Sequence, residues 1–142
     1  MTVIEGVVEH GDARGRTLGF PTANIALTDL EIADGVWAAQ VRIGSDAWAA
    51  AAVSVGRRRT FYAGEGPRLL EAHLLDFAGD LYGQRLRIEL VTQLREQQSF
   101  SDIHALTEQL HRDIEDTRTW ATTHCPWLLN NQGSTTRESA LV

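Results

Sequence analysis

LLEAHLLDFAGDLYGQRLRIELVTQL, residues 69–94, contains two apolar runs separated by turn residues. The runs predict strands at Leu69–Phe77 and Gln84–Leu94, and the segment AGDLYG between them has the glycines and aspartate of a turn. In the second run apolar residues alternate with charged ones: Leu86, Ile88 and Leu90 stand between Arg85, Arg87 and Glu89. Strict alternation is typical of a strand with one face buried and the other in water, so we expect a β-rich fold.

Three further β-rich runs precede this stretch. Val3–Glu9 predicts a first strand, and Gly35–Ile43 and Ala47–Val55 predict a hairpin around the turn Gly44-Ser45-Asp46. The turn at residues 78–83 likewise predicts a hairpin. Because antiparallel strands leave exposed edges unless the sheet curls, we expect five or six strands in a closed or nearly closed barrel.

The apolar period changes to that of a helix near Asp102, and Ser101 or Asp102 can cap its start. The apolar face consists of Ile103, Leu106, Leu110 and Ile114. We therefore expect one domain over residues 1–120 that ends in this helix, followed by a flexible tail over residues 121–142. Within that tail, Trp127, Leu128 and Leu129 are able to dock on the domain.

Composition narrows the class of protein. The length of 142 residues suits one domain, and the net charge of −6 argues against a nucleic-acid or anionic-membrane binder. All 13 basic residues are arginine, which excludes a Walker A loop with its lysine. We find no transmembrane run and no signal peptide. The single cysteine, Cys125, cannot form an internal disulfide; we expect it to be chemically passive and the protein to be cytoplasmic.

The segment GDARGRTLGFPTAN, Gly11–Asn24, is rich in glycine and hard ligands. Glycines allow backbone N–H groups to form an anion nest, and Arg16 can add a charge-assisted contact to phosphate. Thr22 and Asn24 carry neutral oxygens that suit Mg²⁺. From residue types alone, a phosphate site and an ordinary glycine-rich turn both remain open.

The longer string GVVEHGDARGRTLGFPTANI, Gly6–Ile25, resembles the signature of the riboflavin kinase family, and PTAN, Pro21–Asn24, is its hallmark. Further segments resemble that family in the same order: ADGVWA (Ala33–Ala38), VSVG (Val53–Gly56), EAHLLDFAGDLYGQRLRI (Glu71–Ile88) and LREQQSF (Leu94–Phe100). The resemblance covers about residues 3–118. It implies a six-stranded antiparallel Greek-key barrel with a C-terminal helix, and ATP-dependent phosphorylation of the riboflavin 5′-hydroxyl to give FMN and ADP.

The resemblance also implies roles for individual residues. Glu71 matches the catalytic base, and Thr22 and Asn24 match the ligands of Mg²⁺. The residues expected to bind the nucleotide and flavin are Gly11, Gly15, Arg16, Gly19, Phe20, Pro21, Thr22, Asn24 and Arg95. Riboflavin and ATP are the expected partners, and we expect a monomer.

Several of these residues also have plain structural interpretations. Arg95 either contacts substrate or pairs with a surface acid, and a lone strand glutamate such as Glu71 is often only a solvated charge. We interpret His73 as structural and Asp76 as a strand-end or turn residue. Tyr82 and Phe100 match family positions, but we expect them to pack in the core.

The sequence departs from the family pattern at three points. Arg58 and Arg59 stand where the family has Asn and Pro, so Arg57–Arg59 is either a solvated loop or an anion contact. Gln97 replaces a common acid. The adenylyltransferase domain of the bacterial bifunctional enzymes is missing, so a complete chain of this length would not make FAD by that route. A non-catalytic flavin- or nucleotide-binding module and a kinase for a riboflavin analogue are the alternative functions.

Overall fold

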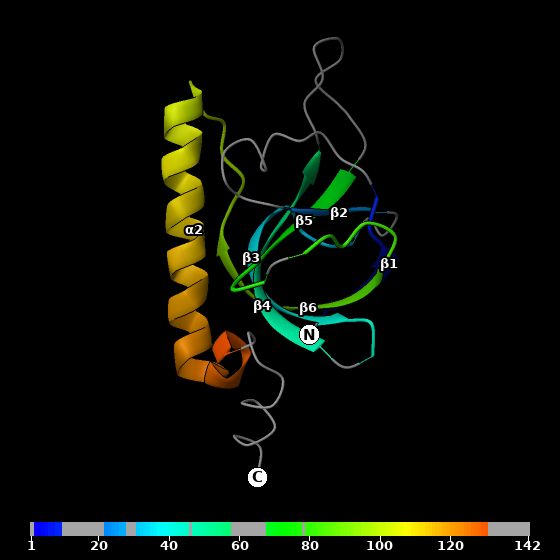
Figure 1. Ribbon diagram of the computed structural model, residues 1–142. Helices are drawn as coiled ribbons and strands as arrows, with labels where there is room; N and C mark the ends of the chain where they lie inside the picture. The colour runs from blue at the N-terminus through cyan, green and yellow to red at the C-terminus, as the bar shows by residue number, and fades with distance from the viewer. Residues whose placement is uncertain are drawn as a thin grey trace.

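A computed structural model shows six strands curled into a barrel, with a long helix lying along its outside (Figure 1). The structure describes residues 2–9, 22–27, 31–45, 47–57, 68–77 and 79–130. Within these residues no helix has the length and apolar character needed to cross a membrane.

All strand pairings are antiparallel, and the sheet order is β1-β6-β3-β4-β5-β2. The strands are β1 (Thr2–Val7), β2 (Ala23–Ala26), β3 (Gly35–Ile43), β4 (Ala47–Arg57), β5 (Arg68–Leu74) and β6 (Arg85–Arg95). Strands β3, β4 and β5 follow one another in the sheet, and β6 returns to lie beside β3. This is the Greek-key order, so the fold expected from the family resemblance is confirmed.

The two edge strands approach each other and nearly close the barrel. The Glu9 backbone N–H donates to the Asn24 carbonyl at 2.7 Å, just beyond the end of β1. A Cβ atom placed on Gly6 would lie 2.6 Å from Cγ2 of Ile25 in β2. The close approach of β1 to β2 therefore depends on the missing side chain at residue 6.

The barrel interior is filled by the apolar residues of alternating positions. Leu86, Ile88 and Leu90 are fully or almost fully buried there, as their alternation with charged residues predicts. The same alternation places Leu70 and Ala72 of β5 inside the barrel. Residues at the intervening positions consequently face outward, and this outer face carries the polar groups of interest.

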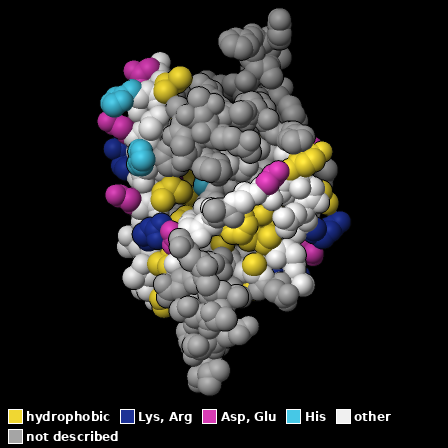
Figure 2. Space-filling model, viewed as in Figure 1, with side chains coloured by type: hydrophobic (Ala, Val, Ile, Leu, Met, Phe, Trp, Pro, Cys, Tyr) yellow, Lys and Arg dark blue, Asp and Glu magenta, His cyan; other side chains and the backbone are white. Residues whose placement is uncertain are grey.

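The helix α2 (Ile103–His124) is capped by Asp102, whose Oδ1 accepts a hydrogen bond from the Ala105 N–H at 2.8 Å. It packs on the outside of the sheet through a second apolar cluster. That cluster contains Ala38, Ala50, Trp120, Ala121, Cys125 and Leu128. Away from the barrel, acidic, basic and histidine side chains line the helix (Figure 2).

The buried face of α2 differs from the one that apolar spacing predicts. Ile103 is 56% exposed, and the buried positions are Asp113, Thr117, Trp120 and Ala121. Leu106, Leu110 and Ile114 are half-buried, so the apolar spacing locates the helix and most of its packed face but misses the positions that are most buried. The reason is that two of the buried positions are polar and satisfied by hydrogen bonds: Thr117 Oγ1 donates to the Asp113 carbonyl, and the Asp113 carboxylate accepts from a strand arginine.

The packed structure continues past residue 120. The helix extends to His124 and is followed by the 3₁₀ helix η1 (Pro126–Asn130). Leu128 is buried against the helix and sheet, whereas Trp127 is 43% exposed. Residues 131–142 lie outside the described residues, so a flexible tail stays a prediction for them.

Two expectations about the strands are corrected. Strands β5 and β6 do not pair with each other, so the turn before β6 does not close a hairpin. Its turn residues are correct, since Gly79 and Gly83 have positive φ angles of 132° and 80°, but the chain crosses to β3 instead. The short strand β2 begins at Ala23, within the PTAN motif, and continues to Ala26, where no strand was expected.

Candidate active site

Five residues from five strands form one continuous row on the outer face of the barrel. Arg95 of β6 pairs with Val36 of β3, Val36 with Ser54 of β4, Ser54 with Glu71 of β5, and Glu71 with Asn24 of β2. We refer to these residues as the outer row. Their sequence neighbours, including Leu70, Ala72, Val53 and Val55, are in the barrel core, so the outer row points the other way.

The strand register brings Asn24 and Glu71 together. Directly opposed residues of antiparallel strands have Cα atoms about 4.5–5.5 Å apart, so their side chains lie side by side. Asn24 is only 6% exposed, and Glu71 is half-buried. Two residues that different segments of the family resemblance assign to metal binding and to proton transfer are thereby neighbours.

The oxygens around Asn24 are suitable for Mg²⁺. Thr22 immediately precedes β2 and stands two residues before Asn24, the spacing at which side chains share one side of an extended backbone. Their neutral oxygens and the adjacent Glu71 carboxylate are hard donors. Mg²⁺ typically takes one or two protein oxygens and completes its shell with phosphate and water oxygens. Among the described residues, no group of three His, Cys, Asp or Glu side chains is arranged to hold a metal.

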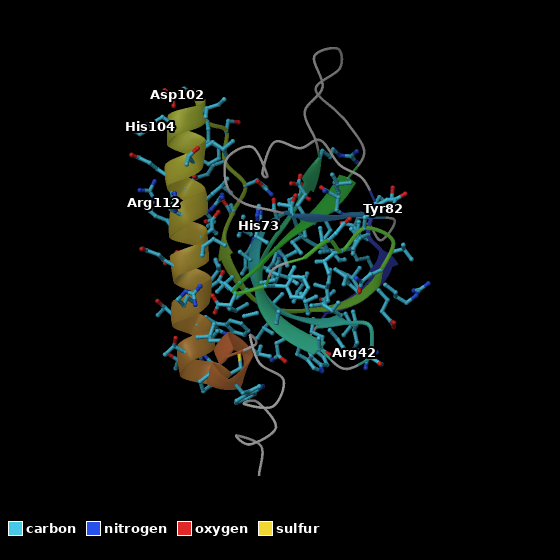
Figure 3. All side chains as sticks on the ribbon, viewed as in Figure 1. Arg42, His73, Tyr82, Asp102, His104 and Arg112 are labelled. Carbon is cyan, nitrogen blue, oxygen red and sulfur yellow. The ribbon has the colours of Figure 1, made fainter. Side chains whose placement is uncertain are left out.

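His73 follows Glu71 on the same face of β5 and lies between the sheet and α2 (Figure 3). Burial lowers the pKa of His73 to about 4, although the charge of Asp113 acts to raise it. The imidazole is therefore neutral at physiological pH. This is consistent with the structural interpretation of His73.

Arg95 forms a bidentate ion pair with Asp113 of α2. Its Nε donates to Oδ1 and its Nη2 to Oδ2, both at 2.7 Å. The Asp113 side chain is 5% exposed and the Arg95 side chain 17%. Arg95 pairs with an acid, as one of its two interpretations predicts, but this acid is buried and belongs to the helix rather than to the surface.

Gln97 joins the ends of β3 and β4 next to the outer row. Its side-chain amide donates to Ser54 Oγ and to the Val55 carbonyl, both at 2.9 Å, and more weakly to the Gly35 carbonyl at 3.4 Å. A carboxylate at this position has no proton to donate to the two carbonyls. Gln97, which replaces the acid common in the family, therefore makes hydrogen bonds that a carboxylate could not make here.

Other predicted residues have mixed outcomes. Asp76 is a turn residue with a φ angle of 56°, as expected, and pairs with Arg118 of α2 at 2.9 and 3.0 Å. Tyr82 is 52% exposed, so its expected core packing is wrong; it lies on the side of the barrel away from α2 (Figure 3). Phe100 is half-buried, with its ring centre 5.9 Å from Cζ of Arg95. Burial raises the pKa of the Cys125 thiol, as expected for a passive cysteine.

The glycine-rich segment lies outside the described residues, and its roles stay predictions. This applies to Gly11, Gly15, Arg16, Gly19, Phe20 and Pro21. Arg58 and Arg59 are also outside the described part of the chain, while Arg57 is the last residue of β4. The choice between a solvated loop and an anion contact therefore stays open.

Sequence reasoning missed Ser54 and Asp113 as neighbours of the site. Ser54 has no motif of its own and is identified only by the register between β4 and β5. Asp113 carries a possible signal, because the apolar positions of the helix do not explain why an acid occupies its buried face. The ion pair with Arg95, 18 residues earlier in the chain, explains why an acid is buried at this position.

Comparison with known proteins identifies the family and the fold. The model of the family described as "Flavokinase: Riboflavin kinase" matches residues 1–121. A bifunctional riboflavin kinase/FMN adenylyltransferase from Pseudomonas fluorescens is 41% identical over 119 residues, covering 83% of this chain and 38% of that protein. The chain spans little more than a third of the length of the curated relatives it matches.

Two crystal structures share the fold. A protein from Streptococcus pneumoniae described as a macrolide-efflux protein has a TM-score of 0.72 and 38% identity, covering 83% of this chain and 38% of that one. Riboflavin kinase from Trypanosoma brucei has a TM-score of 0.63 and 23% identity, covering 86% of this chain and 80% of that one. The fold and the outer row define an antiparallel Greek-key barrel of the riboflavin kinase type. The chain belongs to the riboflavin kinase (flavokinase) family.

Proposed function

We propose that this protein transfers the γ-phosphoryl group of ATP to the 5′-hydroxyl of riboflavin, giving FMN and ADP. Family membership supports riboflavin and ATP as the substrates. The observation that carries the proposal is the register of β2 and β5, which sets Asn24 directly opposite Glu71. Because the chain spans just over a third of its bifunctional relatives, their adenylyltransferase activity forms no part of the proposal.

Glu71 serves as the general base in this proposal. The riboflavin 5′-oxygen forms a bond to the γ-phosphorus while the bond from that phosphorus to the β,γ-bridging oxygen breaks, and ADP leaves with the bonding electrons. The proton of the 5′-hydroxyl moves to a carboxylate oxygen of Glu71. Phosphoryl transfer depends mainly on positioning and charge neutralisation, and a half-buried strand residue holds its carboxylate in a fixed place.

Thr22 and Asn24 are the residues that would hold Mg²⁺, which neutralises phosphate charge when it is bound. The predicted role of Gly11–Phe20, wrapping the phosphates with backbone N–H groups, supplements these ligands. Arg95, at the other end of the outer row, is a candidate for binding substrate oxygens.

The Glu71→Gln variant tests the base. We expect FMN formation to fall by roughly 10²–10⁴-fold, the usual contribution of a positioned base, while riboflavin binding persists. FMN is measured by chromatography after incubation with riboflavin, ATP and Mg²⁺. The matched control is Glu89→Gln, which alters an outward-facing, half-buried glutamate on β6 that pairs with Arg87 at 3.0 Å. The control should retain near-normal turnover.

A near-normal rate for Glu71→Gln would remove Glu71 from the mechanism. A folded wild-type protein that binds riboflavin and forms no FMN would support the non-catalytic binding module instead. Riboflavin analogues in the same assay distinguish a kinase with a shifted substrate.

The Asn24→Ala variant tests the metal ligands. Losing one of the two neutral oxygen ligands should raise the Mg²⁺ concentration that gives half-maximal activity. High Mg²⁺ concentrations should restore part of the lost activity. The measurement is a Mg²⁺ titration of FMN formation at saturating riboflavin. An unchanged Mg²⁺ midpoint would contradict the assignment of Asn24.

A further inference from the structure

The ion pair between Arg95 and Asp113 is more elaborate than the docking of α2 requires. The helix already packs through the apolar cluster around Trp120, and a second bidentate pair, Arg118–Asp76, ties it to the turn after β5. Apolar residues of similar volume often stabilise a protein as well as a buried ion pair does, or better. Stability of the helix contact alone therefore does not explain a buried carboxylate at residue 113.

The contacts of Asp113 leave its carboxylate little freedom. Oδ1 accepts from Arg95 Nε and from Gln109 Nε2 at 3.0 Å, and Oδ2 accepts from Arg95 Nη2. The guanidinium in turn donates from Nη1 to the Glu96 carbonyl at 3.0 Å and lies near the Phe100 ring. The guanidinium plane is thus held from three sides.

These contacts leave part of the guanidinium available. An arginine has five N–H groups, and the bonds to Asp113 and Glu96 use three of them. Two N–H groups have no partner among the residues that the structure describes. Arg95 is also a member of the outer row, three strands from Glu71, which corresponds to about 14 Å measured along the curved sheet.

Asp113 lies close to the catalytic side of the row as well as to Arg95. Its charge acts on His73, which sits two residues from Glu71 on the same face of β5. The Arg95–Asp113 pair therefore borders the region that a substrate must span between Glu71 and Arg95.

We infer that Asp113 is a positioning residue: it holds Arg95 so that the two remaining N–H groups of the guanidinium bind an acceptor oxygen of a substrate. This inference rests on the proposed kinase function. The shared chemistry is an oxygen acceptor, which is either a phosphate oxygen of ATP or a carbonyl oxygen of the flavin. Planar, doubly donating recognition of such oxygens is characteristic of arginine.

The test replaces the ion pair with an apolar pair of similar size. In Arg95→Met/Asp113→Leu the helix contact is kept, because neither member is left as an unpaired buried charge. We expect the double variant to fold, with a thermal midpoint near that of the wild type. Its kcat/KM should fall by about 10- to 100-fold, the usual value of charge-assisted hydrogen bonds. The substrate whose KM rises identifies the oxygen that Arg95 binds.

The matched control alters the other bidentate pair in Arg118→Met/Asp76→Asn. Asparagine is chosen because residue 76 has a positive φ angle, which asparagine tolerates. Arg118 lies five residues along the same helix, about 7.5 Å further from the outer row. The control should keep kcat/KM within threefold for both substrates.

A kcat/KM of Arg95→Met/Asp113→Leu within threefold of the wild-type value would overturn the inference. The ion pair would then be only a structural link between α2 and β6. Asp113→Asn, which keeps Arg95 and the size of residue 113, decides if the double variant does not fold: a positioning role predicts a raised KM for one substrate, and a structural link predicts a lower thermal midpoint with KM unchanged. Riboflavin binding, followed by quenching of its fluorescence, and ADP binding by calorimetry compare the variants without turnover. A wild-type protein that forms no FMN therefore fails the proposed function while these measurements still test Asp113.

Discussion

The pairing of Asn24 with Glu71 depends on the position of each residue in the sheet. Motif resemblance singles out each residue, but only the β2–β5 register shows that they are neighbours. Asn24 is buried although amides are usually exposed, which agrees with a fixed ligand rather than a surface group. Arg95 shows the opposite case, because its sequence leaves two roles open and the structure shows its pairing with an acid, Asp113.

His73 should make stability depend on pH. Its pKa is about 4 in the folded protein and about 6.5 when unfolded, so between these values the unfolded state binds more protons. The free energy of unfolding should therefore fall as pH falls through this window, by about 2 kcal/mol between pH 7.5 and pH 5. Urea unfolding of the wild type and of His73→Gln at both pH values measures the effect.

The His73→Gln variant should lose most of that pH-dependent difference. His104→Gln is the control, because the His104 side chain is 83% exposed on α2 and far from buried in the fold. An equal pH dependence in the wild type and in His73→Gln would show that His73 is not held neutral by the fold.

At the scale of elements, the sequence predicts five strands, the helix and the β3–β4 hairpin, but not the other strand partners. The alternation in β6 and the turn at Gly44 are local signals, so β3, β4 and β6 agree closely with expectation. Strand β2 has only four residues, ANIA, and its conformation comes from pairing with β5, which is remote in sequence. Turn residues before β6 show that the chain reverses, but not which strand it then meets.

The approach of β1 to β2 gives a prediction at this scale. Gly6→Ala should lower the free energy of unfolding by about 1–3 kcal/mol, because the new Cβ would lie 2.6 Å from Cγ2 of Ile25. Urea denaturation measures the change. In an Ile25→Ala background the obstructing methyl is gone, so the same substitution should cost much less. Additive effects of the two substitutions would contradict the proposed contact.

For the whole molecule, the mainly β class and the C-terminal helix follow from local patterns, whereas the Greek-key order follows from the family resemblance. The site is only partly predictable from sequence. Thr22, Asn24, Glu71 and Arg95 are identified through their motifs, but Ser54 and Asp113 enter through strand register and a helix–strand ion pair. Such contacts join residues distant in sequence, and single-sequence patterns carry no information about them.

Among the described residues, the side chains packed inside the barrel are apolar, and the proposed chemistry belongs to its outer wall. Consecutive residues along β5 are consequently subject to different physical constraints. Leu70 and Ala72 are constrained by the volume they fill, while Glu71 and His73 are constrained by what they present on the other side. Substitutions at every second position of a strand therefore change the outer wall without changing the packed interior. The same packed interior can thus support outer faces that differ in their side chains.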